Sequence, residues 1–229
     1  MELAEVMRTT GACREFTTEP VDDETLRHIL DAARFAPSGG NRQPWRVVRI
    51  EKPTLRAEIS RLYGLGWREY WAHVERGLVP FAPGEDGSWN GPAVDLVAAR
   101  ERPAPDAFGD ELASVPVMLV LLAHLGSLAV TDNGLGRQSI VGGASVYPFG
   151  HNVLLAARNE GLGGVMTTVL CRQEDAVREL LGIPPSFAVA GLIAIGHPVR
   201  QIHRLRRQPV EEFTFLDRFG EGAEPAREA

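Results

Sequence analysis

Lysine is almost absent from this chain, and its absence limits the possible chemistry. Lys52 is the only lysine, so nearly all of the positive charge comes from arginine. A P-loop NTPase needs a lysine beside a glycine-rich turn, and Lys52 lies in the sequence EKPTL, which has no such turn. An anion bound by this protein must therefore be held by arginine, by backbone N–H groups or by hydroxyl groups.

Cysteines, metal-ligand spacings and long apolar runs are also scarce. The two cysteines, Cys13 and Cys171, cannot form a disulfide framework or a zinc site by themselves, and the six histidines show no spacing such as H-E-x-x-H. The most apolar stretch, VPVMLVLLAHLGSLAV, contains polar residues and falls short of the ~20 apolar residues that span a bilayer. The opening MELAEVMRTT does not resemble a signal peptide. We therefore expect a cytoplasmic protein with neither a bound metal nor a membrane partner.

The remaining composition is typical of one folded domain. The 229 residues are 44% hydrophobic, and a net charge of −6 argues against a nucleic-acid partner. Helical and strand patterns alternate without a simple β-α-β succession, which favours an α+β fold over a Rossmann domain. We predict a single domain over residues 1–219, with a mixed β-sheet wrapped by helices, and a flexible tail over residues 220–229.

Hydrophobic periodicity predicts the elements of this fold. Asp22 is the expected N-cap of the first long helix. Residues 67–110 contain a long stretch rich in glycine, proline and aspartate, and connections of this length are usually functional or mobile. We expect this segment to be a lid or an exchanged loop. The expected helices cover residues 21–36, 53–76, 142–161 and 171–182, and the expected strands cover residues 45–50, 115–124, 165–170 and 187–196.

A polar turn, APSGGNRQPW at residues 36–45, carries the densest chemistry. Ser38, Asn41 and Gln43 offer side-chain hydrogen-bonding groups within six positions, so one planar polar ligand could be bound along its edge. The alternative is an elaborate turn that ends a helix and leads into a strand. The two interpretations have about equal weight on these residues alone.

Arginines gather near both ends of the chain. Arg8 and Arg14 flank two threonines, Thr9 and Thr10, and guanidinium groups with hydroxyls suit a phosphate. A second group, Arg204, Arg206 and Arg207, lies close to the C-terminus. For each group taken alone, solvated surface arginines are the more common explanation.

Two apparent motifs fail because their context is wrong. GLGGVMTTVL follows a predicted helix and precedes a predicted strand, the reverse of the order in a dinucleotide-binding fingerprint. GGASVYP lacks the second glycine of a serine-hydrolase elbow. Thr167 and Thr168 remain as hydroxyls that could face a ligand, although threonine pairs are common in strands for their β-propensity alone.

Taken together, these segments resemble the nitroreductase family of FMN-dependent oxidoreductases. The resemblance covers residues 7–218, and the polar turn is its most specific part. The matching segments are, in order, CREF, APSGGNRQPW, GLGGVMTT, LLGIPPSFAV, IAIGHP and RRQPVEE.

The resemblance implies an intertwined homodimer with FMN at its interface. It assigns the FMN phosphate to Arg8, Thr9 and Arg14 with Arg206 or Arg207, which could reach the partner's flavin. Thr167 and Thr168 would face the ring near its reactive nitrogen, where Thr168 could tune the flavin. The residues that would line the ring and the ribityl chain are Pro37, Ser38, Gly39, Asn41 and Gln43.

The chain also departs from the family pattern. Thr10, Gly11 and Ala12 stand where many members have Arg-Arg-Ser or Arg-His-Ser, which predicts loose FMN binding. Residues 67–110 match neither the iodotyrosine dehalogenase lid nor the lid of the flavin-cleaving branch. Aromatic residues of this segment are candidates to cover the ring or the acceptor, although core or dimer packing is the more common role for any single one: Trp67, Tyr70, Trp71, Phe81 and Trp89.

The implied activity is reduction of electron-poor acceptors, such as nitroaromatics or quinones, with NADH or NADPH in a ping-pong cycle. The cofactor carries the electron chemistry, which agrees with the lack of a side-chain nucleophile. Two alternatives stay open. One is a one-electron reductase of the dehalogenase type on the same fold, and the other is a flavin-binding or storage protein without activity. The residues do not distinguish FMN from a deazaflavin.

Overall fold

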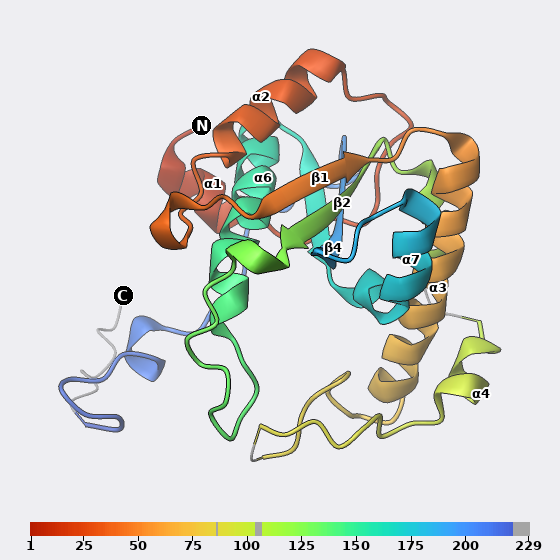
Figure 1. Ribbon diagram of the computed structural model, residues 1–229. Helices are drawn as coiled ribbons and strands as arrows, with labels where there is room; N and C mark the ends of the chain where they lie inside the picture. Colours follow the sequence, from red (N-terminus) through yellow and green to blue (C-terminus); the bar gives the residue numbers. More distant parts are fainter. Residues whose placement is uncertain (86, 104–106, 222–229) are drawn as a thin grey trace.

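The computed structural model describes residues 1–85, 87–103 and 107–221, and a four-stranded sheet lies at its centre (Figure 1). The strand order is β1-β2-β4-β3, and each neighbouring pair is antiparallel. Among the described residues, parallel pairing is limited to an isolated bridge between Ala12 and Gly164, so the mixed character that we expected comes from this bridge alone. The strands are β1 (Trp45–Arg49), β2 (Val117–His124), β3 (Gly163–Thr167) and β4 (Phe187–Gly196).

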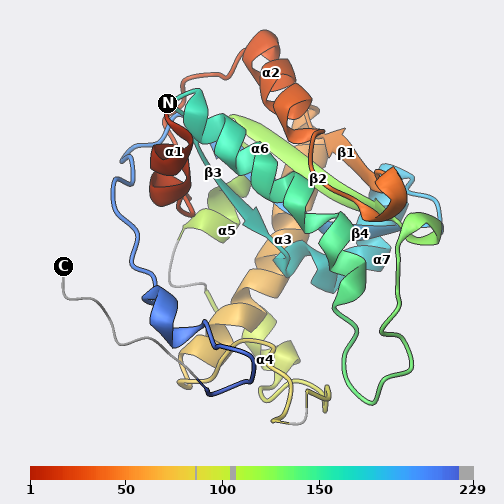
Figure 2. The same ribbon diagram turned by 90° about the vertical axis from the view of Figure 1, so that its left-hand side faces the viewer.

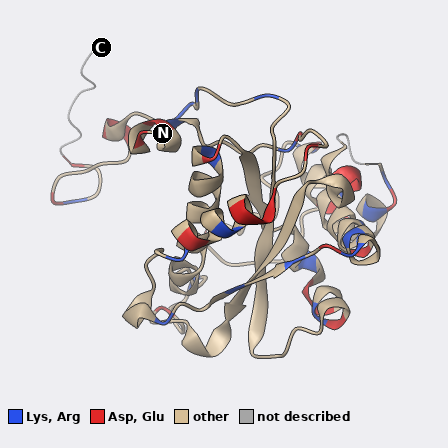
Figure 3. Cartoon of the chain, turned by 90° about the horizontal axis from the view of Figure 1, so that it is seen from above, with Lys and Arg blue, Asp and Glu red and all other residues tan. Residues whose placement is uncertain are grey.

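The two inner strands are apolar because both faces of the sheet are covered. Along β2, Leu119 and Leu121 belong to the core on one face, whereas Met118 and Val120 belong to the core on the other. Neither β2 nor β4 contains an Asp, Glu, Lys or Arg residue. Figure 3 accordingly shows charges of both signs on the surrounding helices and loops.

One face of the sheet is covered by α2 (Asp23–Ala33) and α6 (Tyr147–Asn159). The predicted N-cap is confirmed, because the Asp22 carboxylate accepts a hydrogen bond of 2.8 Å from the Thr25 N–H. The rings of Trp45 and Phe149 stack at 5.1 Å and join the start of β1 to α6. This contact ties the end of the polar turn to the core.

The opposite face is covered by α3 (Pro53–Val74), η5 (Val169–Gln173) and α7 (Glu174–Leu181). Helix α3 approaches η5 closely at Gly66, where an added Cβ would lie 2.9 Å from the Val169 carbonyl oxygen. Gly182 ends α7 in the left-handed conformation, which glycine adopts readily.

Short elements connect these layers. Residues 198–221 run along the outside of the molecule, past α1 and away from the sheet (Figure 2). The predicted tail, residues 220–229, lies outside the described residues from position 222 onward. No helix in the described part of the chain has the length and apolarity needed to cross a membrane. The short elements are α1 (Leu3–Thr9), η1 (Gly39–Asn41), α4 (Leu96–Arg100), α5 (Phe108–Glu111), η2 (Leu112–Ser114), η3 (Leu125–Ser127), η4 (Val141–Ser145) and η6 (Val210–Glu212).

Several predicted elements have different bounds in the structure, and the helix expected at residues 171–182 is divided between η5 and α7. The helix expected at residues 142–161 begins as the 3₁₀ turn η4, and α6 starts only at Tyr147, because Pro148 favours the first turn of a new helix. The strand expected at residues 165–170 starts earlier, at Gly163, and ends at Thr167. There the Thr167 hydroxyl accepts a hydrogen bond of 3.4 Å from the Val169 N–H and turns the chain into η5.

Candidate active site

The polar turn before β1 is an ordered and exposed loop. The Ser38 hydroxyl accepts a 3.0 Å hydrogen bond from the Gln43 N–H, and the Gly39 N–H donates to the Ser145 hydroxyl at 3.1 Å. Asn41 and Gln43 have positive φ angles of 54° and 48°, which few residues other than glycine adopt. Such strained positions often occur at binding sites.

This loop presents a hydrogen-bonding edge to solvent. The Gln43 side-chain amide donates to the Asn41 side-chain oxygen at 3.1 Å. The described residues give the Gln43 Oε1 acceptor and the Asn41 Nδ2 donor no partner. Both side chains are exposed, as are Pro37 and Gly39. An adjacent donor and acceptor suit the edge of a planar heterocycle.

Arg8 and Thr9 lie at the end of α1, but their side chains face different surroundings. Arg8 is exposed. Thr9 is buried, and its hydroxyl donates to the Glu5 carbonyl at 2.8 Å and accepts from Arg158 Nε at 3.0 Å. Arg158, at the end of α6, is only 9% exposed and was not expected from the sequence, because it occupies an ordinary helical position. The Thr9 hydroxyl is therefore already bonded within the chain.

Arg14 is exposed, and its guanidinium group lies against two aromatic rings. Its guanidinium carbon is 5.9 Å from the centre of the Trp67 ring and 6.0 Å from that of Phe108, within the range of cation–π contacts. Arg14 and Arg200 both line a pocket of about 360 Å³, together with Glu15 and Glu111. Arg200 was missed from the sequence, although it begins the basic run that ends at Arg207.

Thr167 ends β3 next to α3, and Thr168 follows it as the residue before η5. The Thr167 and Tyr63 hydroxyls are 3.3 Å apart, and Thr168 is exposed. The ring of Tyr63 in turn stacks on Trp67 at 5.8 Å. A continuous row of contacts thus leads from Arg14 through the two rings to Thr167.

Arg206 and Arg207 are exposed, and the Arg207 side chain donates to the Arg206 carbonyl at 2.7 Å. The segment just before them returns to the N-terminal part of the chain, between α1 and α2. An added Cβ at Gly11 would lie 2.7 Å from an Ile202 methyl carbon and 2.9 Å from a Leu205 methyl carbon. The C-terminal arginines therefore follow directly on a contact with the segment that joins Arg8 to Arg14.

Within one chain, the polar turn and the arginines near the N-terminus lie at opposite ends of the sheet. The Cys13 N–H donates to Gly164, which is level with Val117 across the sheet, whereas Trp45 pairs with Ala123. Six residues of β2 separate these levels, about 20 Å at the usual rise per residue. Figure 2 shows α1 and the loop that precedes β1 on opposite sides of the molecule. One chain does not bring these two predicted groups together.

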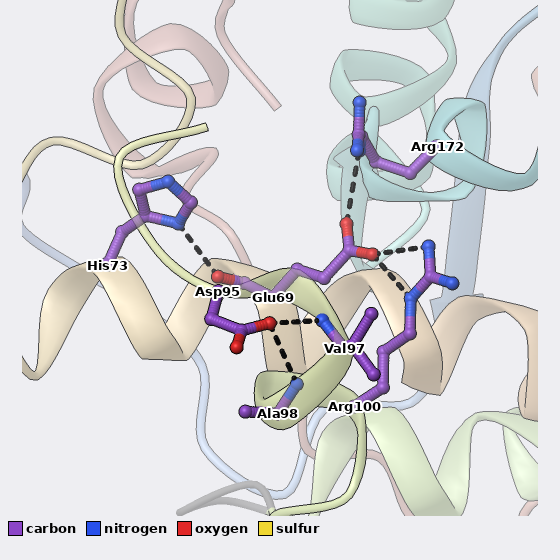
Figure 4. Close-up of polar contacts among 7 residues, drawn as sticks. All are labelled: Glu69, His73, Asp95, Val97, Ala98, Arg100 and Arg172. Atoms are coloured by element: carbon purple, nitrogen blue, oxygen red, sulfur yellow. Dashed lines mark hydrogen bonds and ion pairs between the residues drawn. The ribbon is translucent and has the colours of Figure 1, made fainter. Parts of the chain in front are cut away.

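A buried ion cluster that the sequence did not reveal holds part of the expected lid in place (Figure 4). Glu69 of α3 is completely buried, and its carboxylate binds Arg100 of α4 at 2.6 Å and Arg172 of η5 at 3.1 Å. Asp95 caps α4 through the Val97 and Ala98 N–H groups. The sequence offered no signal, because a lone glutamate in a helix is normally exposed.

Part of the expected lid at residues 67–110 therefore belongs to the packed fold and is not a free loop. Its first eight residues belong to α3, and Trp67 is a buried member of the core beside Tyr63 and Phe108. Phe81 and Trp89, in contrast, line a surface pocket with Arg172. Within the described parts of the chain, no group of three or more potential metal ligands comes together.

The fold is shared with solved structures of oxidoreductases. The chain superposes on the NADPH:FMN oxidoreductase from Vibrio harveyi, complexed with NAD+, with a TM-score of 0.66 at 21% identity, and the match covers 96% of this chain and 78% of that chain. At this identity, the likeness shows the fold. The sequence profile of the nitroreductase family matches residues 7–197, so the chain belongs to the nitroreductase family. The resemblance inferred from the motifs is confirmed, and the chain is an oxidoreductase of this family.

Relatives of known description match along most of this chain. It is 32% identical over 203 residues to an NADH dehydrogenase from Thermus thermophilus, with 86% of this chain and 87% of the relative covered. It is also 29% identical over 198 residues to a 5,6-dimethylbenzimidazole synthase from Rhodobacter capsulatus, with 86% and 83% covered. The family therefore includes relatives with different reactions at similar distance.

Proposed function

We propose that this protein is a homodimeric, FMN-dependent oxidoreductase that uses NADH or NADPH to reduce small electron-poor acceptors such as nitroaromatics or quinones. The observation that carries this proposal is the exposed donor and acceptor edge at Asn41 and Gln43, within the segment that matches the family. The names of the Thermus and Vibrio relatives, which refer to NADH and to NADPH with FMN, support the choice of cofactors.

The residues present fit FMN at both of its ends. Ser38, Asn41 and Gln43 provide hydrogen bonds for the ring and the ribityl chain, while Pro37 and Gly39 complete the same exposed loop. Arg8 and Arg14, with Arg206 or Arg207, provide guanidinium groups for the phosphate. The hydrogen bond between Thr9 and Arg158 fixes the end of α1, where Arg8 lies. Thr167, the last residue of β3, and the exposed Thr168 directly after it are placed near the ring.

A second subunit completes the proposed site. The polar turn and Arg14 are separated by about 20 Å along the strands of one chain, so both can contact one flavin only if a partner supplies one of them. Exposed apolar side chains in the C-terminal segment, Val210, Phe213 and Leu216, support an exchange of this segment between subunits, since each is at least 60% exposed.

Bound FMN supplies the transfer of two electrons from the nicotinamide to the acceptor, so the protein needs no nucleophile of its own. For a nitro group, two electrons and two protons yield a nitroso group and water. The side chains bind and orient the cofactor and the substrates, and they exclude water from the site. The predicted lid at residues 67–110 covers the acceptor, with Phe81 at the pocket wall and the exposed Trp89 as aromatic members.

The test begins with the absorbance spectrum of the purified chain after incubation with FMN and desalting. We expect flavin bands at about one FMN per chain, followed by steady NADH or NADPH consumption when a quinone is added. A protein that remains colourless and does not quench FMN fluorescence would overturn the proposal and direct attention to a deazaflavin. Retained flavin without nicotinamide consumption would instead favour a storage protein.

A further inference from the structure

A surface pocket of about 700 Å³ lies where three separate segments meet. The segments are the part of the expected lid that contains Phe81, Ser88 and Trp89, the loop at residues 135–138, and η5. Two aromatic rings and two guanidinium groups dominate the lining, which includes Phe81, Trp89, Leu135, Arg137 and Arg172. The first of these segments belongs to the expected lid at residues 67–110.

Phe81 is held in an unusual position at the wall of this pocket. Its φ angle is +55°, a left-handed conformation that is unfavourable for a bulky residue. Its ring lies 4.8 Å from the ring of His73, and the guanidinium carbon of Arg172 lies 5.1 Å from its centre. These contacts hold Phe81 in its strained conformation. Residues held in this way are concentrated at binding and active sites. Trp89 adds a second large ring that is 42% exposed.

The arginines at and behind the pocket carry more positive charge than the carboxylate of Glu69 neutralises. Arg100 and Arg172 share the single carboxylate of Glu69, so this buried cluster has a formal charge of +1 (Figure 4). Arg172 uses only Nε for Glu69, and its two terminal nitrogens have no acceptor among the described residues. Arg137 is fixed by Asp132 at 2.9 Å and by the Gln138 carbonyl at 2.6 Å, and its side chain is 44% exposed. A preorganised guanidinium beside an aromatic wall suits an anionic group on a planar ring.

We propose that this pocket binds a planar aromatic acid, with its ring against Phe81 and Trp89 and its acid group paired with Arg172 and Arg137. Arg172 lies four residues beyond Thr168, about 8 Å along the 3₁₀ helix, so a ligand held here can extend toward the end of β3. In this respect the inference rests on the proposed function, because the ligand would then be the electron acceptor.

Equilibrium binding tests the pocket without relying on turnover. Isothermal titration of the full chain with 2-naphthoate and with the neutral 2-naphthamide compares two ligands that cannot be reduced under these conditions. We expect the acid to bind at least about tenfold more tightly, and Arg137→Gln or Arg172→Gln to remove about tenfold of that affinity. Arg34→Gln is the matched control, since Arg34 is an exposed arginine paired with Asp31 on another face. Equal affinity for the two ligands, or unchanged affinity in both pocket variants, overturns the inference.

Two further readouts separate the possible failures. If Arg172→Gln does not fold because Glu69 loses a partner, then Arg137→Gln and Trp89→Leu still decide the matter, and Trp89→Leu should remove the tryptophan quenching caused by naphthoate. Turnover of 4-nitrobenzoate should exceed that of 4-nitrobenzamide in kcat/KM, and Arg137→Gln should erase this preference. Reduction of neither nitro compound, with naphthoate still bound, contradicts the proposed function alone. Equal reduction of both, with no naphthoate binding, contradicts the pocket alone.

Discussion

The hydroxyl groups of Tyr63 and Thr167 lie 3.3 Å apart and join the middle of α3 to the last residue of β3. Tyr63 is fully buried, so its hydroxyl also helps to position the turn at which η5 begins. This contact connects the core on one face of the sheet with the threonines that we place in the site.

Replacing Tyr63 with phenylalanine should remove this contact while keeping the packed ring. We expect a loss of about 0.5–1.5 kcal/mol in the free energy of unfolding, measured by urea denaturation. Tyr70→Phe is the control, because Tyr70 stacks on Trp67 at 4.9 Å and makes no hydroxyl hydrogen bond in the described structure. Equal effects of the two changes would show that the contact with Thr167 contributes nothing measurable.

Glu69→Gln should destabilise the chain and loosen the attachment of α4. The change leaves Arg100 and Arg172 without their carboxylate, and breaking a buried pair typically costs 3–5 kcal/mol. Since both arginines are more than a third exposed, at 39% and 35%, we expect about 2 kcal/mol. Thermal unfolding and limited proteolysis of residues 77–103 provide the measurements. Glu75→Gln, which breaks an exposed pair with Arg102, should change neither.

Arg14→Ala should weaken FMN binding by roughly 1.5–3 kcal/mol, the range for a charge-assisted hydrogen bond. The measurement is the dissociation constant from quenching of FMN fluorescence. Arg34→Ala serves as the control, because this arginine stacks on Phe35 and pairs with Asp31 outside the proposed site. An unchanged dissociation constant in Arg14→Ala would remove Arg14 from the phosphate site and leave it a structural residue on Trp67.

Stability should depend on pH through Asp132. Hydrogen bonds from the Ile140 N–H, the Ser139 hydroxyl and Arg137 hold the pKa of the Asp132 carboxyl well below its ordinary value of 3.8. A depressed pKa means that the charged form stabilises the folded state above about pH 4, and that this contribution is lost as the pH falls toward the lowered value. The difference in melting temperature between the wild type and Asp132→Asn should therefore shrink below about pH 4. A constant difference down to about pH 2 would contradict this account.

Neither cysteine should react readily in the folded protein. Burial raises the pKa of the Cys171 thiol to about 12, and burial also raises the pKa of Cys13. Because the thiolate is the reactive form, iodoacetamide at about pH 8 should label both residues only after unfolding in urea. Mass spectrometry of tryptic peptides distinguishes the two sites. Labelling of the native protein at either cysteine would show that its segment opens.

Much of this molecule follows from the local sequence. The helix that begins at Asp22 and the buried strands β2 and β4 were predictable, because capping and hydrophobic periodicity are properties of neighbouring residues. The family followed from the order of short motifs, chiefly the polar turn before Trp45. The scarcity of lysine left arginine, backbone N–H groups and hydroxyls to hold any anion, and in the structure Arg14 and Arg200 line one pocket.

Only the tertiary structure decided which distant residues meet. The burial of Glu69 between Arg100 and Arg172, the bond between Thr9 and Arg158, and the row from Arg14 to Thr167 all join residues more than 30 positions apart. Local patterns contain no information about such contacts, because chain folding and side-chain packing determine them together. For the same reason, only the strand register placed the polar turn and the N-terminal arginines at opposite ends of the sheet, which is why the proposed site requires a second subunit.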